Sequence, residues 1–189
     1  MKINAINVRS GNVLEIEGKL LVVIKIEIIQ PGKGNAIVQV DMRDARTGVK
    51  TNMRFRTQES VERVRVDEKD FQFLYAETDG SLTFMDLENF EQMTIQRDVV
   101  GEQADFLQES MQVSMEIYEG RPLAVTLPTS VVMEIKEADP VVKGQTASSS
   151  YKPAILENGA RIMVPPHIEA GTKVVVNIAE RAYMERFKG

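Results

Sequence analysis

Short strand-like runs separated by turn residues are the feature of this sequence that most restricts its fold. The first 60 residues hold four such runs, rich in Val, Ile and Leu, with glycine-containing turns nearby. These runs are 13–16, 20–29, 36–42 and 49–55. Many short strands with a turn after each favour small barrels or sandwiches over alternating strands and helices. The sequence therefore predicts an all-β fold.

One stretch departs from this pattern. Between residues 99 and 111, Val100, Ala104, Leu107 and Met111 recur at roughly helical spacing. The spacing predicts a single short helix that caps a barrel.

The distribution of charge divides the chain into three segments. The whole chain of 189 residues has a net charge of -5. Residues 1–64 hold 11 Lys and Arg against 7 Asp and Glu, residues 65–127 hold 4 against 14, and residues 128–189 hold 8 against 7. The first segment can approach RNA, whereas the acidic middle segment is poorly suited to phosphate. Ordinary solvated surface charge would also explain part of this asymmetry.

Composition and turn residues place domain boundaries at the same points. Arg65 is followed by the acidic run VDEKD, and Pro128 interrupts one strand-like run before another begins at Val131. We therefore expect three domains, at 1–64, 65–127 and 128–189, with the first two packed together. The serine-rich stretch 144–153 lies inside the third domain, where we expect a surface loop.

Several classes of protein are excluded by what the chain lacks. It has no cysteine, so it can form neither a disulfide framework nor a thiolate nucleophile. The opening MKINAINVRSGNV has no apolar signal core, and the longest apolar run, Leu20 to Ile24, is too short to cross a bilayer. We expect a cytoplasmic protein with no membrane partner.

The segment 26–42 contains the most distinctive local motif. Pro31, Gly32, Lys33, Gly34 and Asn35 lie between two strand-like runs, which places Lys33 at the apex of a hairpin. Proline presets one backbone angle and the glycines tolerate positive φ, so the tip is narrow and carries one long cationic side chain. Such a tip suits insertion into a tight, RNA-lined cavity. A favourable turn without further function is the alternative that these residues leave open.

Other chemistry is not supported by the motifs. A phosphate-binding P-loop would need glycine at position 27 and Ser or Thr after Lys33, but the chain has Glu27 and Gly34. The single histidine, His167, has no evident Ser or Asp partner, and the acidic residues show no metal-loop spacing. We expect no enzyme activity, no cofactor and no metal site.

Two separated motifs together resemble the bacterial translation elongation factor P family. The first is the PGKG hairpin, of the lysine type. The second is KPAILENGARIMVPPHIEAG, and FLYAETDGSLTFMD at 73–86 is similar to the hairpin of the family's middle domain. The residues of the second motif that match the family signature are Lys152, Ala154, Gly159, Ile162, Val164, Pro165, Ile168 and Gly171.

This resemblance implies a fold and a function. The fold is an N-terminal KOW-type, SH3-like barrel followed by two OB-fold barrels, in an L-shaped arrangement that mimics tRNA. The function is binding to the 70S ribosome beside peptidyl-tRNA, where the factor promotes peptide-bond formation and relieves stalling at consecutive prolines. Family members carry a modification on the residue that matches Lys33, often a β-lysyl group, so a lysine-modifying enzyme is an implied partner. We expect a monomer.

The sequence departs from the family near its C-terminus. Many members have a Thr-Gly-Glu-Tyr-Val pattern where this chain has residues 180–184, so the turn glycine is replaced by Arg181. The resemblance still implies candidate RNA contacts at Tyr183 and Arg186.

Two other functions stay open. A generic OB-type RNA-binding protein would use aromatic side chains in a basic groove, against which the absence of Trp and the acidic middle segment weigh. An enzyme with Lys33 as a Schiff-base nucleophile would need a buried, desolvated lysine, and a glycine-flanked tip provides the opposite environment.

Overall fold

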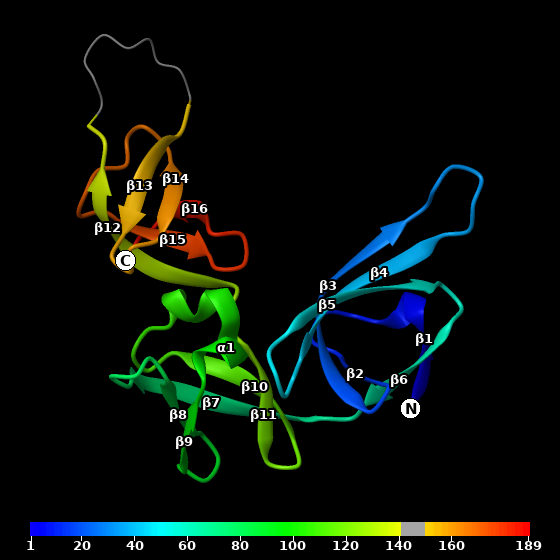
Figure 1. Cartoon of the computed structure of the whole chain (residues 1–189). Helices are drawn as coiled ribbons and strands as arrows, with labels where there is room; N and C mark the ends of the chain where they lie inside the picture. The colour runs from blue at the N-terminus through cyan, green and yellow to red at the C-terminus, as the bar shows by residue number, and fades with distance from the viewer. Residues whose placement is uncertain (141–149) are drawn as a thin grey trace. The chain divides into compact units, whose positions relative to one another are not determined.

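The computed structural model describes residues 1–140 and 150–189, and the strands in these ranges form three antiparallel sheets (Figure 1). The predicted all-β fold is confirmed. Residues 144–149 of the expected serine-rich surface loop lie outside the described residues.

The first sheet contains six strands in the order β1-β6-β2-β3-β4-β5. Its elements are β1 (Lys2–Asn4), the 3-10 helix η1 (Ala5–Asn7), β2 (Val13–Ile16), β3 (Lys19–Ile29), β4 (Ile37–Asp44), β5 (Lys50–Arg56) and β6 (Ser60–Val64). All four strand-like runs of the N-terminal sequence are therefore strands. Each pairing in this sheet is antiparallel.

The core of the first sheet follows from alternation along its strands. On β4, Val38, Val40 and Met42 are fully buried, whereas the residues between them are half-buried. Because successive side chains of a strand point to opposite faces, this period of two directs one face of β4 into the core. Leu21 and Val23 of β3 join the same cluster.

The second sheet contains five strands in the order β11-β10-β7-β8-β9. Its strands are β7 (Asp67–Ala76), β8 (Leu82–Asp86), β9 (Gln92–Ile95), β10 (Gln112–Tyr118) and β11 (Arg121–Thr126). Phe73 and Phe84 are directly opposed across β7 and β8, with ring centroids 5.3 Å apart at an interplanar angle of 61°. This edge-to-face pair stabilises the core of the sheet.

The predicted helix is present only in part. Helix α1 (Arg97–Val100) makes a single turn, and the chain continues as the 3-10 helix η2 (Gly101–Phe106). Gly101 has a φ of 81°, which lies outside the right-handed helical region. A continuous α-helix therefore cannot pass through residue 101, which sequence periodicity did not reveal.

The third sheet contains five strands in the order β14-β13-β12-β15-β16. Its strands are β12 (Ser130–Ala138), β13 (Lys152–Leu156), β14 (Arg161–Val164), β15 (Lys173–Asn177) and β16 (Ala182–Arg186). Met133, Ile135, Leu156, Val164 and Val176 are among the side chains that form its buried face.

The described chain divides into two compact units. One comprises residues 1–100 and 113–126, and the other comprises residues 101–112 and 127–189. The first two sheets lie in the first unit and the third sheet lies in the second. The segment 101–112 belongs to the second unit although strands of the second sheet flank it on both sides.

Within the first unit, the first two sheets contact each other through an apolar cluster and a partly buried hydrogen bond. Val13 and Val22 of the first sheet pack against Leu123 of β11. Arg43 donates a hydrogen bond from Nη2 to the backbone oxygen of Leu123 at 2.5 Å. Desolvation by burial lowers the pKa of Arg43, which Asp98 and Asp44 partly offset.

Glu116 of β10 introduces an unfavourable group at the same contact. A Cβ atom on Gly11 would lie 3.2 Å from Glu116 Oε1, and Glu116 Oε2 is buried without a hydrogen-bond partner among the described residues. Burial raises the pKa of Glu116, and the Glu68 carboxylate adds to the effect. A buried carboxylate oxygen without a donor lowers stability when it is ionised.

We expect Glu116→Gln to raise the free energy of unfolding at pH 7.5 by about 1 kcal/mol or less, because the residue is half-exposed and water screens its charge. Folding raises the pKa of Glu116, so the native state binds this proton more tightly than the unfolded chain. The carboxyl group therefore lowers stability as the pH rises through its native pKa. Denaturant unfolding at pH 7.5 and pH 4 should show a benefit that shrinks at the lower pH.

Glu88→Gln is the matched control, since Glu88 is an exposed carboxylate of the same sheet. It should change the unfolding free energy little at either pH. A Glu116→Gln variant that is less stable than the parent at pH 7.5 would show that the carboxylate has a favourable partner, contrary to this interpretation.

Candidate functional site

The β3–β4 hairpin positions the candidate site. The two strands pair from Leu21 opposite Asp44 to Ile29 opposite Ile37, with a register shift between Val23 and Lys25. The inner part of β3 is buried in the core of the first sheet, whereas most of residues 24–29 are exposed. The hairpin therefore projects beyond the core that anchors it, as Figure 1 shows.

The turn at the end of this hairpin lies where the sequence predicts it. The amide of Gly34 donates a hydrogen bond to the carbonyl oxygen of Pro31 at 2.7 Å, which closes a turn with Gly32 and Lys33 at its centre. Gly32 has a φ of 39°, a conformation that costs glycine little. Residues 31–35, including Asn35, are all exposed.

Gly34 is required by close packing rather than by its backbone angle. A Cβ atom at this position would lie 3.2 Å from the carbonyl oxygen of Pro31 and 3.4 Å from Pro31 Cγ. A side chain would therefore press on the residue that accepts the turn's hydrogen bond. The two glycines have different roles: one permits the bend, and the other permits the chain to close it.

Lys33 extends from this turn into solvent. Its side chain makes no hydrogen bond or ion pair in the described part of the chain, whereas Lys25 pairs with Glu27 on the same hairpin at 2.8 Å. An exposed ammonium group is a mobile donor of three hydrogen bonds. It lacks the apolar pocket that a lysine nucleophile needs, so the geometry suits contact with an anionic surface better than covalent catalysis.

Residues beside the tip, which the sequence analysis did not single out, extend the site. Arg56 of β5 lies opposite Ile37, at the base of the tip, and Arg54 donates a hydrogen bond to Gln39 at 3.2 Å. Ile28 and Ile29 of β3 are 59% and 38% exposed although they are apolar. The sequence MRFR at 53–56 contains the signal that could have identified the arginines. Its alternation buries Phe55 and leaves Arg54 and Arg56 exposed on the other face of β5.

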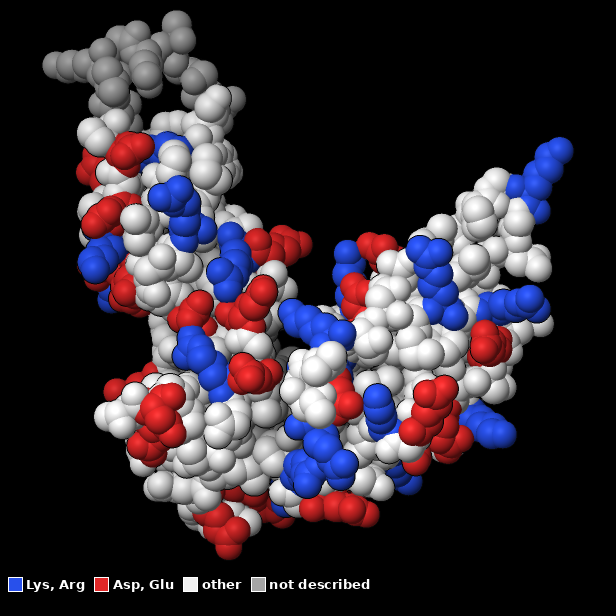
Figure 2. Space-filling model, viewed as in Figure 1, with Lys and Arg blue, Asp and Glu red and all other residues white. Residues whose placement is uncertain are grey.

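These residues give the hairpin and the adjoining edge a basic character. Figure 2 shows Lys and Arg side chains at the outer end of the hairpin and over the sheet below it. Together with the exposed isoleucines, they form a surface that combines positive charge with apolar contact area. RNA offers phosphate groups and base faces that match both.

The C-terminal signature residues form the frame of the third sheet. Ala154, Ile162, Val164 and Ile168 are buried, and Pro165 accepts a hydrogen bond from the amide of Ile168 at 3.1 Å. They occupy core and turn positions, so a structural role accounts for them.

The remaining signature residues shape turns and a loop. Gly159 and Gly171 have φ angles of 84° and 88°. Lys152 donates a hydrogen bond from Nζ to the backbone oxygen of Asp139 at 2.5 Å. The signature residues lie in the second compact unit, and the Lys33 hairpin lies in the first.

The candidate RNA contacts near the C-terminus differ in exposure. Tyr183 is half-buried and meets Tyr151 edge-to-face, with ring centroids 6.3 Å apart. Burial, followed by Tyr151, raises the pKa of Tyr183. Arg186 is exposed opposite Val174.

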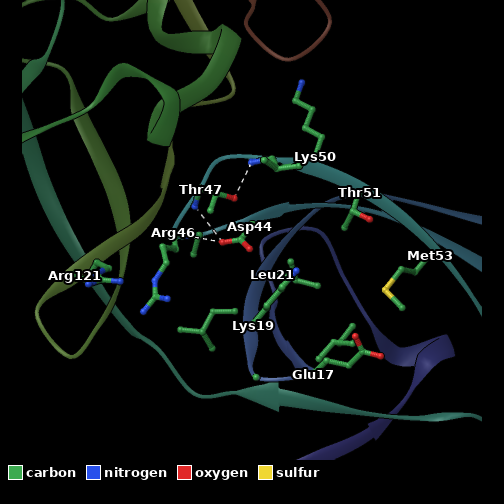
Figure 3. A pocket seen from close by; sticks show the side chains of 15 residues that line it. Glu17, Lys19, Leu21, Asp44, Arg46, Thr47, Lys50, Thr51, Met53 and Arg121 are labelled. Atoms are coloured by element: carbon green, nitrogen blue, oxygen red, sulfur yellow. Dashed lines mark hydrogen bonds between the residues drawn. The ribbon is translucent and has the colours of Figure 1, made fainter.

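A separate cavity of about 770 Å³ opens on the first unit, between the β2–β3 and β4–β5 turns (Figure 3). Lys19, Arg46 and Arg121 line it. The Asp44 carboxylate accepts hydrogen bonds from the amides of Arg46 at 2.8 Å and Thr47 at 3.1 Å, and the Arg46 contact is the main cause of its lowered pKa. Asp44 therefore shapes a turn, and this cavity shows no paired nucleophile and base.

The described part of the chain contains neither a cluster of metal-ligating side chains nor a membrane-spanning helix. No group of three or more His, Asp or Glu side chains there is placed to hold a metal ion. His167 is exposed. Among the described helices, none is long and apolar enough to cross a bilayer.

Three family descriptions match the sequence in order along the chain. "Elongation factor P (EF-P) KOW-like domain" matches residues 4–61, and "Elongation factor P (EF-P) OB domain" matches residues 66–125. "Elongation factor P, C-terminal" matches residues 131–186.

Individual relatives match over the whole length. Elongation factor P of Rhodospirillum centenum is 58% identical over 188 residues, covering 100% of both chains. Elongation factor P of Zymomonas mobilis subsp. mobilis is 55% identical over 186 residues, covering 98% of this chain and 99% of that one. Among solved structures, eukaryotic translation initiation factor 5A from Methanococcus jannaschii is 21% identical and covers 68% of this chain and 92% of its own, with a TM-score of 0.43.

The fold and the comparisons agree. The first sheet belongs to a KOW-like domain, and the other two sheets belong to OB domains. The similarity extends through all three sheets and covers the PGKG hairpin as well as the C-terminal signature. The chain belongs to the elongation factor P family and is a translation elongation factor.

Proposed function

We propose that this factor binds the 70S ribosome next to peptidyl-tRNA and promotes peptide-bond formation by inserting the Lys33 tip toward the peptidyl-transferase centre. Its main effect is to relieve stalling at consecutive prolines. The observation that carries the proposal is the exposed, unpaired Lys33 at the end of a hairpin that projects beyond its own core. Ribosomal RNA and peptidyl-tRNA are the partners that this cationic tip would contact.

The proposed mechanism is one of positioning. Proline fixes φ and restricts the preceding residue, so consecutive prolines misplace the groups that must react. A tenfold to hundredfold gain in rate requires about 1.4 to 2.7 kcal/mol. One or two charge-assisted hydrogen bonds from a lysine tip can supply that amount. The factor would then accelerate transfer without acting as an acid, a base or a nucleophile, so we propose that it is not an enzyme.

A modification of Lys33 would strengthen this mechanism. A lysine side chain loses about 2 kcal/mol of rotamer entropy when it is fixed in one conformation. An extension on Nζ adds reach and further donors, so more hydrogen bonds form for each side chain that is ordered. The exposure of residues 31–35 leaves the tip accessible to a lysine-modifying enzyme.

The rest of the chain would serve as the ribosome-binding body. We propose three domains at 1–64, 65–127 and 128–189, acting as a cytoplasmic monomer without a cofactor or a membrane partner. Arg54, Arg56 and Ile28 would contact RNA beside the tip, and Tyr183 and Arg186 would make a separate RNA contact through the third domain. The family signature residues of that domain would maintain its fold.

A generic OB-type RNA-binding protein is the second candidate function. The observation that favours it is the Tyr151–Tyr183 pair, because Tyr151 is 51% exposed and aromatic rings stack on bases without sequence preference. In that case the affinity for single-stranded RNA would depend on these tyrosines, and Lys33 would contribute no more than any other surface lysine.

Substitution of Lys33 distinguishes the two functions. Lys33→Ala should change the unfolding free energy by less than about 0.5 kcal/mol, because the side chain is exposed and unpaired. Synthesis of a reporter with consecutive prolines should fall toward the level without the factor, whereas a proline-free reporter should hardly change. Lys33→Arg keeps the charge but cannot accept an amine-linked extension, so it should also fail. Full rescue of the proline reporter by either variant would remove Lys33 from its proposed role.

The shape of the turn should matter separately from the charge. Gly34→Ala places a Cβ atom 3.2 Å from the Pro31 carbonyl oxygen, so the turn must shift by a few tenths of an ångström, which changes the direction of Lys33. We expect proline-reporter synthesis to fall severalfold although Lys33 is present and the melting temperature is unchanged. Asn35→Ala, a change at an exposed neighbour, is the control and should have a smaller effect. Equal activity of the two variants would contradict a requirement for this turn.

A further inference from the structure

The contacts of segment 101–112 determine to which compact unit this part of the chain is attached. It follows α1 and precedes β10, so both of its ends continue into the first compact unit, yet it packs with the third sheet in the second unit. The chain therefore passes between the two units at three points, after residues 100, 112 and 126. If the segment detached from the third sheet, it would no longer belong to the second unit. The chain would then pass between the units only once, after residue 126.

Arg181 contacts this segment at three residues. Its Nη2 atom donates a hydrogen bond to the backbone oxygen of Glu102 at 2.9 Å and lies 3.9 Å from Asp105 Oδ2. Its Cζ atom lies 5.5 Å from the ring centroid of Phe106, a side chain with no exposed surface. One guanidinium group thus joins a backbone acceptor, a carboxylate and an aromatic face in the same short segment.

These three contacts differ in strength. The Arg181–Asp105 ion pair is long and both side chains are nearly half-exposed, so solvent screens it. The hydrogen bond to Glu102 has good length but is exposed, whereas the cation–π contact lies against the fully buried ring of Phe106. Both depend on the planar, charged guanidinium group.

The backbone of Arg181 has a conformation that favours glycine over arginine. Its φ is 50°, in the left-handed region where a non-glycine residue is strained and glycine is not. It occupies the turn between β15 and β16. A turn alone would be more stable with glycine, and the contacts of the arginine side chain offset part of this strain.

Two further side chains hold the segment at other points. Asn158 donates a hydrogen bond from Nδ2 to the backbone oxygen of Asp105 at 2.9 Å, and Gln108 donates from Nε2 to the backbone oxygen of Val132 at 2.9 Å. Asn158 contacts one backbone oxygen of the segment, whereas Gln108 belongs to the segment itself. Arg181 contacts three residues of the segment, including the buried ring of Phe106.

We propose that Arg181 is a clasp that keeps segment 101–112 attached to the third sheet. With the clasp closed, the two units are joined through three passages of the chain. With it open, the direct link between β11 and β12 after residue 126 is the remaining constraint, so the second unit swings more freely. This inference does not depend on the role proposed for Lys33.

Hydrogen exchange tests the clasp directly. The amides of Leu107 and Met111 are hydrogen-bonded inside the segment, to the oxygens of Ala104 and Gln108. Arg181→Ala should accelerate their exchange about tenfold, the effect of losing roughly one well-placed contact. Arg181→Gly should accelerate it as well, although glycine relieves the strain at φ 50°. Exchange in Arg181→Gly as slow as in the parent would overturn the proposal, because the arginine would then be no more than a tolerated turn residue.

Two further variants separate the clasp from general loss of structure. Phe106→Leu keeps an apolar side chain in the buried site but removes the aromatic face, so it should accelerate exchange in the segment in the same way. Arg161→Ala removes an exposed arginine of β14 that has no contact with the segment in the described structure and should leave exchange unchanged. Equal acceleration by Arg161→Ala would show that loss of any cation from this sheet is sufficient, which contradicts a specific clasp.

The coupling between the units can be measured in the same variants. The chain contains no cysteine, so Asn89→Cys and Glu169→Cys place one spin label on each unit. Opening of the clasp in Arg181→Ala should broaden the distribution of distances between the labels, while circular dichroism of the sheets is retained. A distribution as narrow as that of the labelled parent would contradict the role of Arg181 in joining the units.

Discussion

The pairing of β3 with β4 is the constraint on which the proposed function depends. On β4 the core side chains Val38, Val40 and Met42 are fully buried, whereas the outer part of β3 is mostly exposed. The outer part of β3 is therefore held by its backbone pairing with β4, which β5 supports from the other side. A rigid base and an exposed end allow a small protein to present one lysine at a distance from its own body.

Much of this arrangement could be predicted from the sequence, because the relevant signals are local. Alternating apolar residues indicate strands, and the PGKG turn indicates where β3 ends and β4 begins. Lys33 was found because proline and two glycines isolate it. The C-terminal motif was found by its resemblance to a family, although the structure shows that its residues occupy core and turn positions in the other unit.

The features that sequence analysis missed depend on contacts between distant residues. The helical spacing at 99–111 suggested one helix, but Gly101 takes a positive φ and the segment packs with the third sheet. The replacement of a turn glycine by Arg181 was visible in the sequence. The contacts of its side chain with Glu102 and Phe106 could not be predicted from the sequence, because some 75 residues separate Arg181 from these partners. Arg54 and Arg56 could be assigned to the candidate site only from the pairing of β5 with β4, which places them beside the hairpin.

The proposed function requires residue 33 to reach the peptidyl-transferase centre. Since the chain contains no cysteine, Lys33→Cys can carry a short photoreactive group at this single position, and Glu169→Cys provides a labelled control in the other unit. Irradiation of the complex with ribosomes stalled at consecutive prolines should join position 33 to the acceptor end of peptidyl-tRNA or to the ribosomal RNA of the catalytic centre. Crosslinks from position 33 that fall elsewhere on the ribosome, or that match those of the control, would contradict the account.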